Sequence, residues 1–264
     1  MCYNVSMSKT SRKTSQKPKA TCKYTPAYAV ICAVLALICI VMFACSYIKK
    51  EQPVEPAPLP ELSALPAPEV TGGVRGELGI DKNINESTID QYLGRYDSVY
   101  RDMRMLEDPG NYEAIGGDRF LSGFVEGFEV VPLPYLAPVS GLPEAVGDTY
   151  KGDTLFSVDS EGNYVANYEE SLTILQELFP KDKNIFLMCG GGGYAGMTKA
   201  MLVSLGWDAS KIWNVGGYWY YEGEHNVEVK KTNEQGETYY DFDSVNYHEI
   251  KFDELTPKNK VAVL

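Results

Sequence analysis

Histidine is nearly absent from this chain, and cysteine is scarce over most of its length. His225 and His248 are the only two histidines among 264 residues. Two are too few for a multi-histidine metal site, so we expect no metal and no cofactor and interpret both as surface residues. Five of the six cysteines lie within the first 45 positions, at Cys2, Cys22, Cys32, Cys39 and Cys45. Cys189 therefore has no evident disulfide partner, and no disulfide framework is expected around it.

Acidic residues are missing from residues 1–50, which contain eight Lys and Arg. The rest of the chain has 16 basic and 36 acidic residues, a net charge of −20. A surface this acidic repels a phosphate backbone, so we exclude nucleic acid as a partner. The basic segment 1–26 is predicted to be a cytoplasmic tail.

Charged side chains are also absent from residues 27–48, which are apolar apart from Cys, Ser and Tyr. About 20 such residues cross a bilayer as a helix. The stretch predicts a single transmembrane helix in the cell membrane. The basic residues ahead of it place the N-terminus in the cytoplasm and the C-terminal domain outside. Two alternatives remain open, a cleaved signal peptide and a lipid-modified Cys45.

The remaining sequence divides into three segments. Residues 49–85 are rich in proline and predict an extended linker. Residues 86–223 alternate strand and helix patterns, which predicts an α/β domain with a mostly parallel sheet and helices on both faces. Residues 224–264 predict a C-terminal β-hairpin appendage. Strands are expected at 97–103, 129–133, 184–188, 211–215 and 247–252. Helices are expected at 168–179 and 195–205, with a helix start at 87–90 and a loop or helix at 112–121. Hairpins are expected at 148–166 and at 227–229 with 238–242.

Cys189 stands between the strand predicted at 184–188 and the helix predicted at 195–205, at the head of the run Cys-Gly-Gly-Gly-Gly-Tyr. Backbone N–H groups of such a loop, together with the positive end of the helix dipole, converge on one small volume. They stabilise a thiolate, so we predict that this thiol loses its proton easily. The alternative is a buried, inert cysteine. The glycine loop favours the reactive interpretation.

Four segments in this order resemble the rhodanese-like domain family, over about residues 96–222. Residues 97–104 match the family's first strand with its Asp-x-Arg ending. Residues 123–132 resemble its Gly-His-Ile-x-Gly-Ala segment, with Phe124 in place of the histidine. Residues 189–196 match the active-site loop and helix start, and residues 214–219 resemble the closing Gly-Gly-aromatic turn.

The resemblance implies transfer of sulfane sulfur through a persulfide on a catalytic Cys189. We interpret Asp102 and Arg104 as a structural pair at a strand end rather than as catalytic residues. The expected partners are a small sulfur donor and acceptor, or a thiol-bearing protein. The loop residues expected to bind the anionic sulfur are Gly190, Gly191, Gly192, Gly193, Tyr194 and Ala195.

The loop departs from the family pattern at three positions. Active family loops commonly carry Arg at the second and sixth positions and Ser or Thr next, where this chain has Gly190, Tyr194 and Ala195. No cation is supplied locally, so thiosulfate is expected to be a poor donor. Phosphatase and arsenate-reductase chemistry are disfavoured, because both need a guanidinium for the oxyanion. The alternative function is a catalytically silent rhodanese fold that serves as a binding module at the cell surface.

Overall fold

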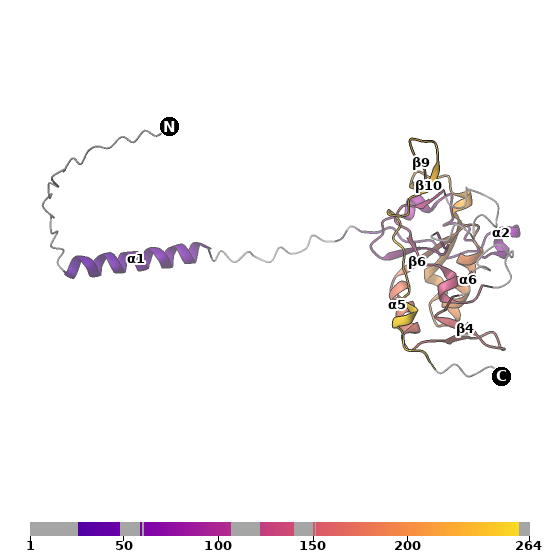
Figure 1. The fold of residues 1–264 in the computed structure, drawn as a ribbon, viewed down its shortest axis with the longest axis horizontal. Coiled ribbons are helices and arrows are strands. Elements are labelled where there is room, and N and C mark those ends of the chain that lie inside the picture. Colours follow the sequence, from indigo (N-terminus) through magenta and orange to yellow (C-terminus); the bar gives the residue numbers. More distant parts are fainter. Residues whose placement is uncertain are drawn as a thin grey trace, which may run out of the picture. The chain divides into compact units, whose positions relative to one another are not determined.

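The computed structural model describes residues 26–47, 59, 61–106, 122–139, 150 and 152–258. The segment predicted over 112–121 and all but the last residue of the predicted tail lie outside these residues. The chain divides into two compact units, residues 1–60 and 61–264, and each is described by itself (Figure 1).

In the first unit the structure describes a helix, α1, over Pro26–Tyr47. Its described side chains from Val30 to Met42 are exposed. Across the described residues, no helix has the combination of length and apolar character needed to cross a membrane. The transmembrane helix predicted over 27–48 is therefore not found.

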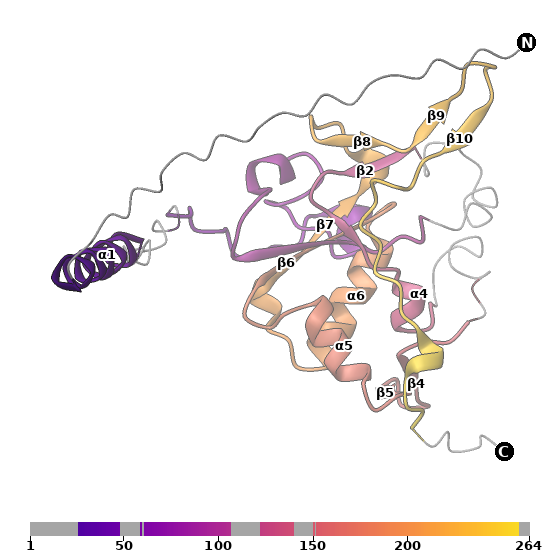
Figure 2. The same cartoon turned by 60° about the vertical axis from the view of Figure 1, so that its left-hand side comes forward.

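A parallel sheet with the strand order β3-β1-β6-β7 forms the centre of the second unit. Its strands are β1 (Ser98–Asp102), β3 (Glu129–Val130), β6 (Asn184–Cys189) and β7 (Ile212–Gly217). Figure 2 labels two of these strands, β6 and β7. All three neighbouring pairs run parallel, which agrees with the predicted class of sheet. β3 is shorter than the strand predicted at 129–133, because Pro132 has no N–H to donate and α4 begins at the next residue.

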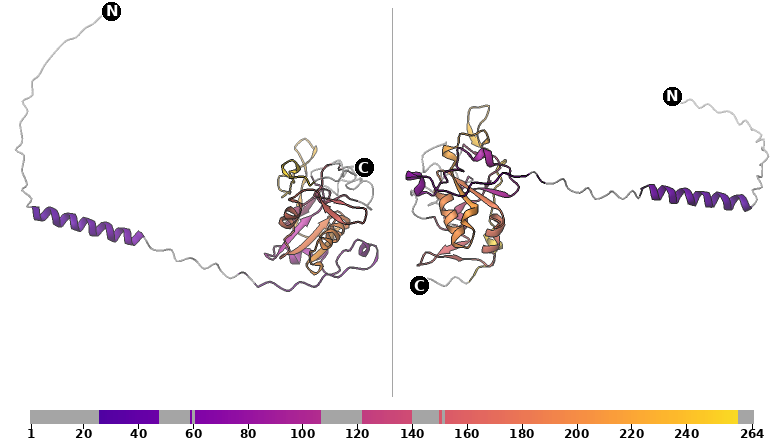
Figure 3. Two further views of the ribbon diagram at one scale, coloured as in Figure 1. Left: turned by 90° about the horizontal axis from the view of Figure 1, so that it is seen from below. Right: turned by 180° about the vertical axis from the view of Figure 1, so that it is seen from behind.

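Successive residues of the strands point to opposite faces of this sheet, as a period of two requires. Leu187 and Cys189 lie in one buried cluster, which also contains side chains of the helices α4 (Leu133–Leu136), α5 (Ser171–Leu178) and α6 (Gly193–Ser204). Figures 2 and 3 show these three helices gathered beside the sheet. Phe186 and Met188 lie in a second cluster.

The second face is covered differently from the prediction of helices on both faces. Its cluster contains residues of the 3₁₀ helices η1 (Ile89–Tyr92) and η4 (Tyr218–Tyr220), of the short strand β2 (Gly123–Val125), and of irregular segments. The helix start predicted at 87–90 produces only η1. Short aromatic and aliphatic segments therefore take the place of a second helical layer.

The segment from Glu61 to Leu93 belongs to the second unit, although residues up to 85 were predicted as linker. Its backbone reaches the edge strand β7, where Asp81 N donates to Asn214 O at 2.8 Å. Ile80 and Ile84 are buried. A short helix, α2 (Gly73–Glu77), precedes them. The covered edge leaves β7 less open to pairing with another chain.

The C-terminal residues are also attached to the sheet. β8 (Asn226–Glu228) pairs with β2, so the predicted hairpin partner at 227–229 is wrong. The hairpin is instead formed by β9 (Lys230–Thr232) and β10 (Thr238–Tyr240). The strand predicted at 247–252 is reduced to a bridge between Tyr247 and Val130. The remaining elements are β4 (Phe156–Val158) and β5 (Tyr164–Ala166), which form the hairpin predicted at 148–166, and the 3₁₀ helices η3 (Ala209–Lys211) and η5 (Phe252–Glu254).

Candidate functional site

Cys189 is the last residue of β6, at the carboxyl edge of the parallel sheet. Its register partner on β7 is Gly217, and Asp102 ends β1 beside Met188. Ligands of open α/β sheets bind beyond the carboxyl ends of the strands. Three of the four segments that carry the family resemblance thus meet at this edge: the ends of β1 and β7, and the loop that leads from β6 into α6.

The loop curls back on the sulfur through Gly192, which has a φ of +101°. A side chain at this residue would be strained, and its Cβ would lie 2.7 Å from Ile80 Cδ1. In this conformation Gly192 N donates to Cys189 Sγ at 3.0 Å. The backbone N–H groups of Tyr194 and Ala195 also stabilise the thiolate. Part of the predicted anion-binding loop therefore faces the sulfur.

The predicted easy loss of the thiol proton is wrong. Cys189 is 3 % exposed, and burial raises the pKa of its thiol. Hydrogen bonds from the amides of Ala195, Gly192 and Tyr194 lower the pKa, but the negative charge of Asp102 adds to the effect of burial. The loss of water outweighs the amides, so the resting form is the neutral thiol.

Asp102 and Arg104 form the predicted pair. The Arg104 Nη2 atom lies 2.5 Å from Asp102 Oδ2, and both side chains are buried. Arg104 also donates to Gly123 O at 3.0 Å and lies over the Tyr218 ring at 4.5 Å. The pair thereby joins β1 to the segments around β2 and η4. Its guanidinium is engaged by a carboxylate, a carbonyl and an aromatic face.

Two residues of the predicted closing turn shape the loop through contacts that the sequence did not predict. Asn214 is buried in β7, donates from Nδ2 to Gly192 O at 3.0 Å and accepts from Gly216 N at 3.0 Å. Trp219 packs its indole against the loop and donates its backbone N–H to Gly190 O at 3.1 Å. The Gly-Gly-aromatic segment pointed to this turn, but no spacing rule shows which ring lies on the glycines.

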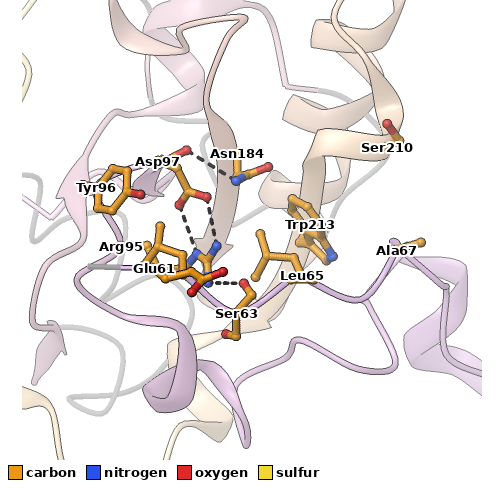
Figure 4. A pocket seen from close by; sticks show the side chains of 12 residues that line it. Glu61, Ser63, Leu65, Ala67, Arg95, Tyr96, Asp97, Asn184, Ser210 and Trp213 are labelled. Atoms are coloured by element: carbon orange, nitrogen blue, oxygen red, sulfur yellow. Dashed lines mark hydrogen bonds and ion pairs between the residues drawn. The ribbon is translucent and has the colours of Figure 1, made fainter. Parts of the chain in front are cut away.

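A separate hollow of about 560 Å³ lies at the opposite edge, by the amino ends of β1, β6 and β7 (Figure 4). The extended segment from Glu61 to Ala67 lines one side. Arg95 binds both oxygens of Asp97 and donates to Ser63 O at 2.9 Å. Trp213 Nε1 donates to Pro66 O at 3.1 Å. These contacts hold the segment in place and are distant along the strands from Cys189.

No family model, curated protein or solved structure matches the chain.

Proposed function

We propose that the second unit is a rhodanese-like domain that carries sulfane sulfur as a persulfide on Cys189. The observation that supports this most is the position of the sulfur. It lies at the carboxyl edge of a parallel sheet, with the amides of Gly192, Tyr194 and Ala195 directed at it. Amides held in this way stabilise a developing sulfur anion without reorganisation.

The transfer has two balanced steps. The Cys189 thiolate attacks the outer sulfur of a persulfide, R–S–SH. A new S–S bond forms to Cys189, the old S–S bond breaks, and R–S⁻ leaves with its electron pair and takes up a proton. An acceptor thiolate then attacks the outer sulfur, and Cys189 leaves as the thiolate. No external oxidant or reductant is consumed.

The buried, neutral resting thiol fits a carrier that protects its sulfur. A persulfide is more acidic than the thiol from which it forms, so the amides of the loop hold a charge in the loaded state that is rare in the empty state. The loop amides therefore stabilise the persulfide anion of the loaded state more than the neutral thiol of the empty state. A slow first step and a long-lived adduct are expected.

The experiment is incubation of the full chain with cysteamine persulfide, whose ammonium group leaves the donor without net negative charge, followed by mass spectrometry of the Cys189 peptide. We expect a gain of one sulfur atom that is absent in Cys189→Ser and is removed by cyanide. Cys32→Ser is the matched control, because Cys32 is exposed and lies in the first unit. Absence of the adduct with persulfide and polysulfide donors would contradict the proposal.

A second candidate is a catalytically silent domain that serves as a binding module. The burial of Cys189 and the raised pKa of its thiol favour this alternative. It predicts that Cys189→Ser keeps every binding property of the chain. The sulfur-loading experiment separates the two candidates.

A further inference from the structure

Trp219 fills the space beside the two residues that follow Cys189. A Cβ on Gly190 would lie 2.4 Å from Cζ2 and 2.5 Å from Cε2 of the indole. A Cβ on Gly191 would lie 3.2 Å from Cζ3 and 3.3 Å from Cε3. All four atoms belong to the six-membered ring, which therefore extends along both glycines. A side chain at Gly190 would clash with the ring, and one at Gly191 would fit only if the ring moved slightly.

The other side of this loop is closed by backbone. A Cβ on Gly217 would lie 1.9 Å from Gly190 O and 2.6 Å from Gly191 Cα. The bond from Trp219 N to Gly190 O fixes the indole's own backbone to the same residue. The glycines next to Cys189 are thus held between Gly217 and an aromatic ring. The conformation of the loop therefore determines the position of the ring.

Charged groups near this loop are neutralised in pairs. Arg104 is bound to Asp102, and Arg75 Nη2 lies 2.5 Å from Glu86 Oε1 beside Gly216. Neither pair offers a net positive charge to an anion. An indole presents negative electrostatic potential at its face, which attracts cations and repels anions.

We propose that Trp219 selects the class of sulfur compound that reaches Cys189: neutral or cationic carriers are admitted, and small anions such as thiosulfate are rejected. This proposal rests on the proposed function of Cys189 and names its substrate class. Trp219 acts as a specificity-determining residue, since it contacts the loop and takes the place where a cationic side chain at position 190 would stand.

The test uses three methanethiosulfonates that share one leaving group and a substituted ethyl chain but differ in charge: the hydroxyethyl, the sulfonatoethyl and the trimethylammonioethyl reagents. The Cys189 thiolate attacks the sulfenyl sulfur, a mixed disulfide forms, and methanesulfinate leaves with the electron pair of the broken S–S bond. Labelling of the Cys189 peptide in the full chain is followed over time by mass spectrometry. We expect the anionic reagent to react about tenfold more slowly than the neutral one, and the cationic reagent at least as fast.

Three variants isolate the indole. Trp219→Phe keeps an aromatic face and should keep the order of rates. Trp219→Leu should bring the anionic and neutral rates to within about threefold, and Trp219→Arg should make the anionic reagent the fastest. Trp207→Phe is the matched control, because that indole donates to Phe179 O in the core. Near-ultraviolet circular dichroism establishes that each variant is folded.

A measurement on the unaltered chain keeps the proposal falsifiable if the variants do not fold. The general field of an acidic protein is screened by 0.5 M salt, over a Debye length of about 4 Å, whereas contact with the ring is not. The preference against the anionic reagent should therefore persist in salt. Equal rates for the three reagents in salt, or no labelling of Cys189 by any of them, would overturn the proposal. Labelling needs no sulfane donor, so failure to form a persulfide is a separate result.

Discussion

The thiol of Cys189 is subject to opposing influences from its immediate neighbours. Burial and the charge of Asp102 raise its pKa, and the loop amides lower it. Because the pKa is raised, the thiolate fraction is small at neutral pH and grows as the pH rises through the pKa. Reactivity at this residue is therefore limited by deprotonation as well as by access.

We expect the rate at which iodoacetamide alkylates Cys189 to keep rising above a pH of about 8.5, where an ordinary thiol levels off. Asp102→Asn removes a negative charge and should raise the rate at pH 7 by about threefold. Peptide mass spectrometry measures the alkylation rate of Cys189 in the unaltered chain and in this variant. Asp97→Asn, at the other edge of the sheet, is the control and should leave the rate and its pH dependence unchanged. A plateau below that pH would contradict the assigned direction of the pKa shift.

The contact between Gly190 and Trp219 gives a second prediction at this scale. In Gly190→Ala the new methyl group would meet the indole at 2.4 Å, so we expect a loss of about 1–3 kcal/mol in the free energy of unfolding. In a chain that already carries Trp219→Ala, the same change at Gly190 should cost less than about 1 kcal/mol, because the clash is gone. Gly191→Ala, with its closest ring atom at 3.2 Å, should be milder. Urea unfolding of these three variants and of Trp219→Ala alone tests this, and strictly additive losses would show that the two residues are not in contact.

At the scale of elements, the segments that could be predicted are those whose pattern is local. The strand at 184–188, the helix that begins near 195 and the hairpin with its turn at 159–163 each carry their own periodicity or turn residues, and the structure contains all three. Pairings between distant segments could not be predicted. Nothing local indicates that β8 joins β2, or that Asp81 meets Asn214.

The candidate site, like the elements, could be predicted only where its sequence pattern is local. The position of Cys189 follows from the strand, glycine and helix pattern around it. Its burial depends on side chains of α4, α5 and α6, and the charge of Asp102 comes from β1, all of which the fold brings together from distant positions. The expectation of an acidic thiol was wrong because it counted the amides and omitted the loss of water.

The segment that covers β7 provides a prediction for an element. Asp81 is buried and accepts hydrogen bonds from the amides of Glu69, Asn83 and Ile84. Asp81→Ala should lower the free energy of unfolding by about 3 kcal/mol, because these donors lose a charged acceptor. It should also speed hydrogen exchange in residues 212–217. Glu69→Gln, which alters only an exposed ion pair with Lys82, should cost less than about 1 kcal/mol. Equal effects of both changes would contradict the role of Asp81.

For the whole molecule, the division at residue 60 predicts which parts fold together. A fragment of residues 61–264 should unfold cooperatively with a melting temperature close to that of the full chain. A fragment of residues 94–264 lacks the buried Ile80, Ile84 and Ile89 and should not fold cooperatively. Calorimetry of both fragments distinguishes a covering segment from a linker. A stable shorter fragment would show that residues 61–93 are dispensable.

The cellular location of the chain stays a prediction, and the chemistry of the second unit can be tested without it. The most direct measurement is the fraction of Cys189 that carries an additional sulfur atom, followed in one sample before and after an acceptor thiol is added. We predict that the fraction rises with a neutral persulfide donor and falls as the acceptor gains the same atom. A fraction that stays at zero while the thiol remains open to alkylation would contradict sulfur transfer by this domain.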